Sequence, residues 1–487
     1  MCDVTKELGL LRRQRKVRTK MLKKNVLWCL AFCIALLLVV PDACFADGHG
    51  MEVIANIDVS LSPRQASEPS VSYNTTNNEF MVMYGETGRR IDHPEDITNK
   101  TNYFSFHGLR VSPTGEFLGG TIEIDPPELG WKAMVKSAYN NLSNEYGVVF
   151  SKGPGVSGRK MYGGIMDNLG NLMHLPKPLW PTLYNVTHPL IIFNPTNEEY
   201  LAVYNDKYVF NTADPNIKNA GLILDKDGEV IGGPIRIDGP AAIGIEFNPQ
   251  GVYNEAEGNY FLGWEDYRHV TSMWQTTEIY GVLLDSEGDL VNEVPLIDDF
   301  AFPNNGRDQR VEYIAYNSDR NEYLVVWAAS AVTTTTLPLN GYISGRIFGP
   351  DGMPIGPEII MATTGNPSTP NVVYVPKLKE YFMVWNDSRE DPTPGPGYSK
   401  NNDIYARWLS KDGKPKYGEI PISIKAGSQT YPQVVYNSKA DNFIIVWTDK
   451  NAPDDYEVIP AGGAMTSISK GDIRGVIYGI LDEDEDE

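Results

Sequence analysis

Short apolar runs alternate with polar turns along most of the chain, and one spacing of aromatic residues recurs within them. In each copy an aromatic, usually followed by Asn, stands seven residues before a second aromatic, and a third follows four residues later. The copies are Tyr73/Phe80/Tyr84, Tyr139/Tyr146/Phe150, Phe193/Tyr200/Tyr204, Tyr253/Tyr260/Trp264, Tyr316/Tyr323/Trp327, Tyr374/Tyr381/Trp385 and Tyr436/Phe443/Trp447. Seven copies spaced 54 to 66 residues apart predict a repeat architecture.

Each copy has the signals of four strands. The run from Leu324 to Trp327 is β-branched and aromatic, as strands prefer. Asp227-Gly228 is a hairpin signal, because glycine adopts positive φ without steric cost. Four antiparallel strands repeated seven times predict an all-β fold, a seven-bladed β-propeller.

The two ends of the repeat array complement each other. The seventh copy stops after its third strand, residues 473–481, whereas residues 51–60 resemble a fourth strand without a blade. An N-terminal strand that completes the last blade would close the ring and remove an open edge. We therefore expect a single propeller domain over residues 47–481, followed by an acidic, disordered tail at 482–487.

The first 46 residues differ from the rest. Nine Lys/Arg lie before a 15-residue apolar run, and small residues ending at Ala46 follow this run. This pattern predicts a signal peptide over residues 1–46, with a possible alternative start at Met21. The run is shorter than the roughly 20 residues of a membrane-spanning helix, so we expect a secreted or periplasmic protein with no membrane span after cleavage. An uncleaved signal-anchor is the alternative.

Cysteine and charge restrict the chemistry. All four cysteines lie in the predicted leader, so the exported chain would have no disulfide, thiolate metal site, cysteine nucleophile or covalently attached haem. Removing residues 1–46 lowers Lys+Arg from 42 to 33 and Asp+Glu from 63 to 60, for a formal charge of −27. So acidic a surface repels nucleic acid, which is excluded as a partner.

Within the repeat, Trp264, Trp385 and Trp447 each open a Trp-x-Asp motif, and several third strands begin with Asp or Glu followed by Ile-Tyr. In these motifs and the Asp-Gly turns the chain resembles secreted bacterial propeller proteins built on Trp-x-Asp-x-Arg, Asp-Ile-Tyr and Asp-Gly repeats. The first three blades lack the Trp, and the fifth has Ala329 and Ala331 in place of Asp and Arg. The resemblance implies a fold and export, since most members have no assigned activity. We interpret the repeated Asp and Arg as structural.

The long connections join strands two and three of each blade, and strand four to the next blade, so they emerge on one face. Loops on a rigid scaffold often carry function. At the start of the innermost strands, the channel mouth would bring together Glu68, Lys136, His188 and Tyr313. These residues would either line a water-filled channel or form a small-ligand or glycan site.

Three tryptophans lie outside the repeat frame, Trp131, Trp180 and Trp274. Exposed rings there would stack on sugars or anchor a protein partner, whereas local packing is the alternative.

Clustered oxygens at Asp387, Glu390 and Asp391 would suit calcium, although no calcium-loop spacing supports it and we expect no cofactor.

No catalytic or cofactor motif is recognisable, so the sequence favours an exported, non-catalytic binding or assembly module for a protein partner or glycan. The alternative is a carbohydrate-active hydrolase or lyase with its site at the mouth of the axial channel.

Overall fold

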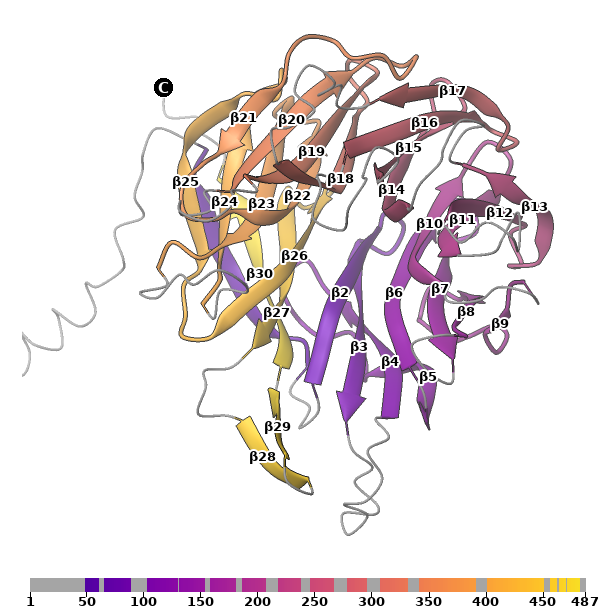
Figure 1. Cartoon of the computed structure of the whole chain (residues 1–487), viewed down its shortest axis with the longest axis vertical. Helices are drawn as coiled ribbons and strands as arrows, with labels where there is room; N and C mark the ends of the chain where they lie inside the picture. Colours follow the sequence, from indigo (N-terminus) through magenta and orange to yellow (C-terminus); the bar gives the residue numbers. More distant parts are fainter. Residues whose placement is uncertain are drawn as a thin grey trace, which may run out of the picture. The chain divides into compact units, whose positions relative to one another are not determined.

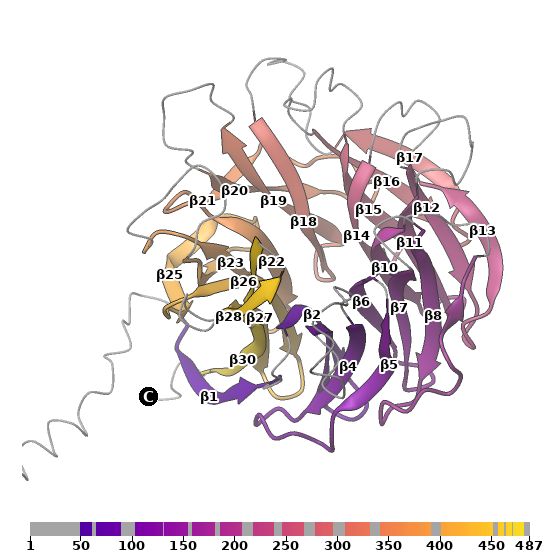
Figure 2. The ribbon, with the colours of Figure 1, turned by 60° about the horizontal axis from the view of Figure 1, so that its bottom comes forward.

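The computed structural model describes residues 49–60, 65–88, 103–129, 131–153, 158–180, 186–206, 218–237, 246–266, 278–295, 307–331, 341–390, 401–450, 456–461, 464–469 and 471–481. In this part of the chain, seven antiparallel sheets have four strands each and one hairpin has two. The innermost strand of each sheet contacts the innermost strands of both neighbouring sheets, which closes a ring (Figures 1 and 2). The fold is therefore the predicted seven-bladed propeller.

The blades follow one another along the sequence. The first is β2 (Gln65–Asn74), β3 (Glu79–Gly88), β4 (Tyr103–Val111) and β5 (Ile122–Leu129). The second is β6 (Trp131–Asn140), β7 (Glu145–Gly153), β8 (Lys160–Met166) and β9 (Lys177–Pro178). The third is β10 (Thr187–Asn194), β11 (Glu199–Asp206), β12 (Lys218–Leu224) and β13 (Val230–Arg236). The fourth is β14 (Glu246–Asn254), β15 (Asn259–Asp266), β16 (Glu278–Asp285) and β17 (Leu290–Pro295).

The remaining blades keep this order until the last. The fifth is β18 (Arg307–Asn317), β19 (Glu322–Ala331), β20 (Tyr342–Phe348) and β21 (Ile359–Ala362). The sixth is β22 (Ser368–Val375), β23 (Glu380–Asp387), β24 (Asp403–Leu409) and β25 (Pro415–Ser423). The seventh is β26 (Ser428–Asn437), β27 (Asn442–Lys450), β30 (Gly471–Ile480) and β1 (Met51–Asp58). The hairpin β28 (Tyr456–Ala461) and β29 (Ala464–Ser469) comes between β27 and β30 in the chain.

The N-terminal strand closes the ring as the sequence predicts. β1 pairs antiparallel with β30, from Met51 opposite Ile480 to Asp58 opposite Arg474. Ile57 is buried in the core that the seventh blade shares with the first. The missing fourth strand of the last blade is thus supplied by the other end of the propeller domain.

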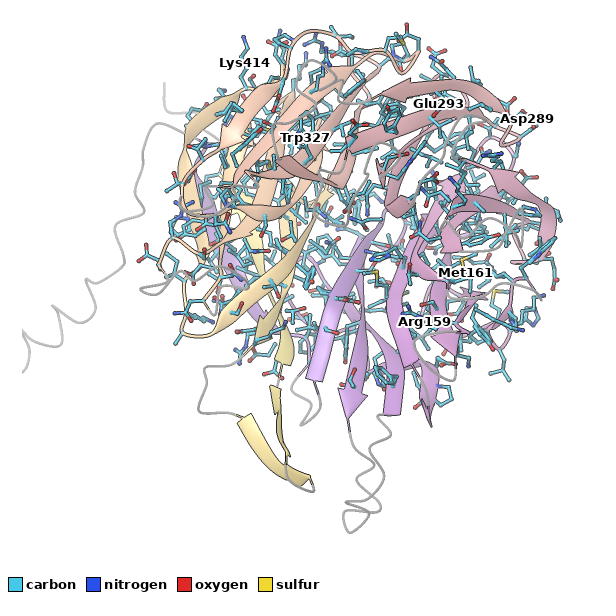
Figure 3. The ribbon with its side chains drawn as sticks, viewed as in Figure 1. Arg159, Met161, Asp289, Glu293, Trp327 and Lys414 are labelled. Carbon is cyan, nitrogen blue, oxygen red and sulfur yellow. The ribbon has the colours of Figure 1, made fainter. Side chains whose placement is uncertain are left out.

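The recurring aromatics form cross-strand pairs in each blade and contribute to its buried core. The first and second aromatic of every copy are cross-strand partners beside the first hairpin, as in Tyr316 opposite Tyr323. Their rings lie 5.7 Å apart, within the range in which aromatic pairs attract. The third aromatic is buried, and Trp327 is only 1% exposed (Figure 3). Core clusters combine side chains of adjacent blades, so each blade is held by its neighbours.

The predicted glycine turns between the third and fourth strands are also present. Gly228 has φ 77° and donates its N–H to the carbonyl of Asp225. The corresponding glycines of the first six copies all have positive φ: Gly115, Gly170, Gly228, Gly288, Gly352 and Gly413.

Among the described residues, no helix is both long enough and apolar enough to cross a membrane.

Candidate functional site at the channel mouth

Each innermost strand contains an irregularity near its beginning, where the register against the second strand shifts. In six blades a residue at this bulge adopts left-handed φ between 46° and 56°, although it is not glycine. These residues, called here the bulge ring, are Glu68, Met134, His188, Asn248, Thr369 and Tyr431. Such backbone strain costs on the order of 1 kcal/mol per residue or more.

The bulge ring lies on the face where the second strands end, since the start of β2 pairs with the end of β3. Glycine would adopt this backbone conformation freely. The chain instead has six different side chains at these positions. A bulge repeated in every blade serves the fold, and it presents a different side chain in each of these six blades.

Glu68 lies at the junction of the first, second and seventh blades. Its backbone N–H donates to the hydroxyl of Thr448 at 3.1 Å, and its carboxylate accepts a hydrogen bond from the backbone of Met134, the next member of the bulge ring. Burial raises the pKa of this carboxyl more than the nearby charges of Lys136, Lys450 and Arg159 lower it. Burial therefore shifts the balance of Glu68 toward its protonated form.

The second and third blades contribute cations and a neutral imidazole. Burial lowers the pKa of Lys136 against the opposing charge of Glu68, and burial likewise lowers the pKa of Arg159, the residue before β8 (Figure 3). Burial, with Arg159 and Lys136 nearby, lowers the pKa of His188 to about 4. His188 is therefore neutral at pH 7, when its ring has one donor and one acceptor nitrogen.

The fifth to seventh blades contribute neutral groups. Tyr313 forms a side-chain hydrogen bond with Asn371, and burial raises the pKa of its hydroxyl. Asn371 in turn donates to the side-chain oxygen of Gln433 at 3.1 Å. Tyr431 of the bulge ring is 43% exposed. Tyr313 is thus linked to Asn371 and Gln433, whereas the charge of Lys136 acts on Glu68 and His188.

A small pocket opens beside Glu68. Its cavity volume is about 20 Å³. It is lined by Ser67, Glu68, Gly85, Glu86, Thr87, Phe104, Ser105, Phe106 and Met134. Glu86 is a second carboxylate in this lining, and its Oε2 lies 3.5 Å from Nε2 of His107. One pocket therefore combines two carboxyl groups with walls of mixed polar and apolar character.

The tryptophans outside the repeat frame have different surroundings. Trp180 is partly buried and packs against the core of the second and third blades, which supports the local-packing interpretation for this residue. Trp131 is the first residue of β6, at a border between a connection and a strand, and its side chain is not among those described. Trp274 lies outside the described residues, as do large parts of the variable connections.

The repeated Asp and Arg have structural contacts in the sixth blade. Asp387 accepts a hydrogen bond from the indole of Trp385 at 3.0 Å. It also forms an ion pair with Arg389 at 2.5 Å. The Arg389 guanidinium also lies 3.7 Å from the ring centre of Tyr405. Among the described residues no group of three acidic, His or Cys side chains could hold a metal ion, and Asp391 of the calcium hypothesis lies outside them.

Two cations of the site were not singled out from the sequence. Arg159 lies between β7 and β8, and Lys450 ends β27 at the unconstrained position after the Asp of a Trp-x-Asp motif, so the repeat pattern singles out neither. Only the three-dimensional arrangement places their charges near Glu68.

No family model matches the chain, and no curated protein matches it. Solved structures match it as folds. An α-L-arabinofuranosidase of Fusarium graminearum is 10% identical with a TM-score of 0.41, covering 86% of this chain and 97% of that chain. An α-L-arabinanase of Penicillium chrysogenum is 11% identical with a TM-score of 0.43, covering 88% and 98%. The Dos1 propeller is 8% identical with a TM-score of 0.46, covering 90% and 97%. Glycoside hydrolases recur among these matches, which are similar to this chain in fold alone.

Proposed function

We propose that the protein is a carbohydrate-active enzyme, a hydrolase or lyase, whose site lies at the mouth of the axial channel. The observation that carries this proposal is the position of Glu68. It is a carboxyl in a strained backbone conformation, beside a pocket, with burial raising its pKa while burial lowers the pKa of neighbouring Lys136. Neighbouring groups whose pKa values are displaced toward neutrality are suited to proton transfer.

Two carboxyl groups line the pocket, and glycoside hydrolysis uses such a pair. Glu68, favoured in its protonated form, would donate a proton to the oxygen of the leaving sugar. Glu86 of the same lining would act as the base or nucleophile. For a lyase, the neutral imidazole of His188 would instead accept a proton from the sugar ring.

The test is a screen of polysaccharides with the full chain, expressed with its leader and purified. Reducing-end release reports hydrolysis, and the ultraviolet absorbance of unsaturated products reports elimination. We expect Glu68→Gln to lower turnover by about a hundredfold or more, as removal of an acid–base group does. Glu198→Gln is the matched control, because Glu198 also has left-handed φ (56°) but lies in the β10–β11 turn.

The other function predicted from the sequence is a non-catalytic binding or assembly module outside the cytoplasm. Saturable glycan binding without turnover of any polysaccharide in the screen would establish that role and reject the enzyme. Turnover that Glu68→Gln leaves unchanged would place the catalytic site elsewhere.

A further inference from the structure

The first described residue, His49, packs against the sixth blade. Its Nε2 lies 3.2 Å from Oε2 of Glu380, the first residue of β23. Its ring centre lies 5.1 Å from that of Trp408 and 5.6 Å from that of Tyr417, and both pairs are edge-on. One polar and two aromatic contacts therefore hold the His49 ring in one orientation.

The Glu380 carboxylate is itself held from a second side. Nζ of Lys416, on β25, donates a hydrogen bond to Oε1 of Glu380, while Oε2 faces His49. The same ammonium lies 4.7 Å from the ring centre of Tyr417. A neutral imidazole that donates Nε2–H to this carboxylate has its lone pair on Nδ1. The contact with the sixth blade thus favours Nδ1 as the nitrogen that can bind a metal ion.

His49 is also the third residue of the exported chain that the sequence predicts. Cleavage of the signal peptide after Ala46 leaves Asp47-Gly48-His49 at the amino terminus. Asp47 and Gly48 lie outside the described residues, so their sequence alone enters the argument. Such a terminus has four nitrogens in succession: the α-amine of Asp47, the backbone nitrogens of Gly48 and His49, and Nδ1 of His49. Successive members of this set are close enough along the chain to close small, unstrained chelate rings.

We propose that the exported protein binds one Cu(II) ion at its amino terminus, with these four nitrogens as square-planar ligands. Cu(II) prefers tetragonal nitrogen ligands and is the tightest-binding divalent ion of the first transition row, whereas Zn(II) prefers a tetrahedral site. Only one ligand is a side chain, so the site differs in kind from the clusters of acidic, His or Cys side chains that the described residues lack. Binding releases the protons of both backbone amides to solvent.

Glu380 acts as a positioning residue for this site. A histidine that binds a metal usually donates its other ring nitrogen to a carboxylate, which fixes the ring and makes the binding nitrogen more basic. With Nδ1 on the ion, Nε2 keeps its contact with Glu380, and Trp408 and Tyr417 restrain the ring. The folded protein should therefore bind Cu(II) more tightly than the same terminus in an unfolded chain. The inference depends on cleavage after Ala46 and is independent of the proposed carbohydrate activity.

The experiment titrates copper(II) chloride into the processed protein. The full chain is exported from a bacterial host with its own leader, and mass spectrometry determines the amino terminus. We expect a chain that begins at Asp47 and binds one equivalent of Cu(II), with proton release and the visible absorption band of a four-nitrogen copper site. His49→Ala should lose this band, whereas His174→Ala, which removes an exposed histidine, should keep it.

Two further variants separate the chelate from its setting. One serine inserted between Ala46 and Asp47 displaces the amine while His49 and its contacts stay unchanged, so the band should be lost. Glu380→Gln should keep the band but weaken Cu(II) affinity by about tenfold or more, measured by competition with a chelator of known affinity. Glu52→Gln, on the exposed part of β1, should leave the affinity unchanged.

A mature chain that begins at another residue would overturn the inference. So would a band that survives His49→Ala or the inserted serine, or Zn(II) binding as tight as that of Cu(II). An affinity that Glu380→Gln leaves unchanged would reject the part assigned to the sixth blade.

Discussion

The side-chain amide of Asn317 donates a hydrogen bond to the hydroxyl of Tyr381 at 3.1 Å, across the boundary between the fifth and sixth blades. The Asn317 side-chain oxygen also accepts from the backbone N–H groups of Asp319 and Arg320, which fixes its own hairpin. Asn74 with Tyr146, at 3.1 Å, and Asn254 with Tyr323, at 2.8 Å, repeat this contact. One residue type of the repeat therefore shapes a turn and joins two blades.

Removing the hydroxyl of Tyr381 should weaken the ring. Tyr381 is fully buried, so Tyr381→Phe leaves the Asn317 amide without this partner, and the free energy of unfolding should fall by about 1–2 kcal/mol. Urea denaturation measures the change. In a double-mutant cycle with Asn317→Ala, a coupling energy near zero would show that the hydrogen bond contributes nothing.

The Asn–Tyr contact also shows which parts of the structure can be predicted from the sequence. Asn after the first aromatic is visible as a pattern, and the pattern predicts the strands, the turns and the ring. The tyrosine to which the Asn donates its hydrogen bond depends on how one blade packs on the next. Glu68 and His188 could be selected from their place at the start of the innermost strands, but their left-handed conformation follows from a bulge that no local signal specifies. Arg159 was missed for the same reason, because its role depends on contacts between blades.

Because β1 closes the ring beside β30, we predict that the protein tolerates a circular permutation. Met51 lies opposite Ile480 at the end of β30, so a short turn could join the two strands as a hairpin. Moving residues 49–60 to follow Leu481 should keep the free energy of unfolding within about 1 kcal/mol, since all contacts are retained. Deleting these residues instead exposes the edge of β30 and the core around Ile57, and should cause unfolding or aggregation. Thermal melts and size-exclusion chromatography distinguish the two, and a permutant as unstable as the deletion would contradict the prediction.

The strain in the bulge ring is measurable at Thr369. Its φ is 47°, which a β-branched residue adopts rarely, whereas Asn tolerates this region. Thr369→Asn should therefore raise the free energy of unfolding by up to about 1 kcal/mol. Thr430→Asn is the control, since Thr430 pairs with Thr448 just before the register shift of β26 but does not itself have left-handed φ, so it gains no such relief. Equal effects of the two substitutions on chemical denaturation would show that strain at Thr369 is not relieved.

Glu68 should reduce stability at neutral pH. Its folded-state pKa is raised, so its contribution to stability is present below the unfolded pKa of 4.5 and is lost as the pH rises through the folded-state value. Gln cannot ionise, so Glu68→Gln does not lose this stability as the pH rises. The melting temperature of the variant should be higher than that of the wild type at pH 8 but not at pH 4. A variant that melts lower than the wild type at pH 8 would mean that the ionised carboxylate stabilises the fold through its cationic neighbours.

His188 should make stability depend on pH in the opposite sense. Its pKa is about 4 in the folded protein and 6.5 in the unfolded chain, because burial and the charges of Arg159 and Lys136 oppose its protonation. The unfolded state therefore binds a proton first as the pH falls, and stability present above pH 6.5 is lost progressively down to pH 4. At pH 5 this loss amounts to about 2 kcal/mol. His188→Gln has no such proton to bind, so relative to the wild type it should gain that much between pH 7 and pH 5. Chemical denaturation at both pH values measures the difference, and parallel pH profiles for the two proteins would show that His188 titrates normally in the folded state.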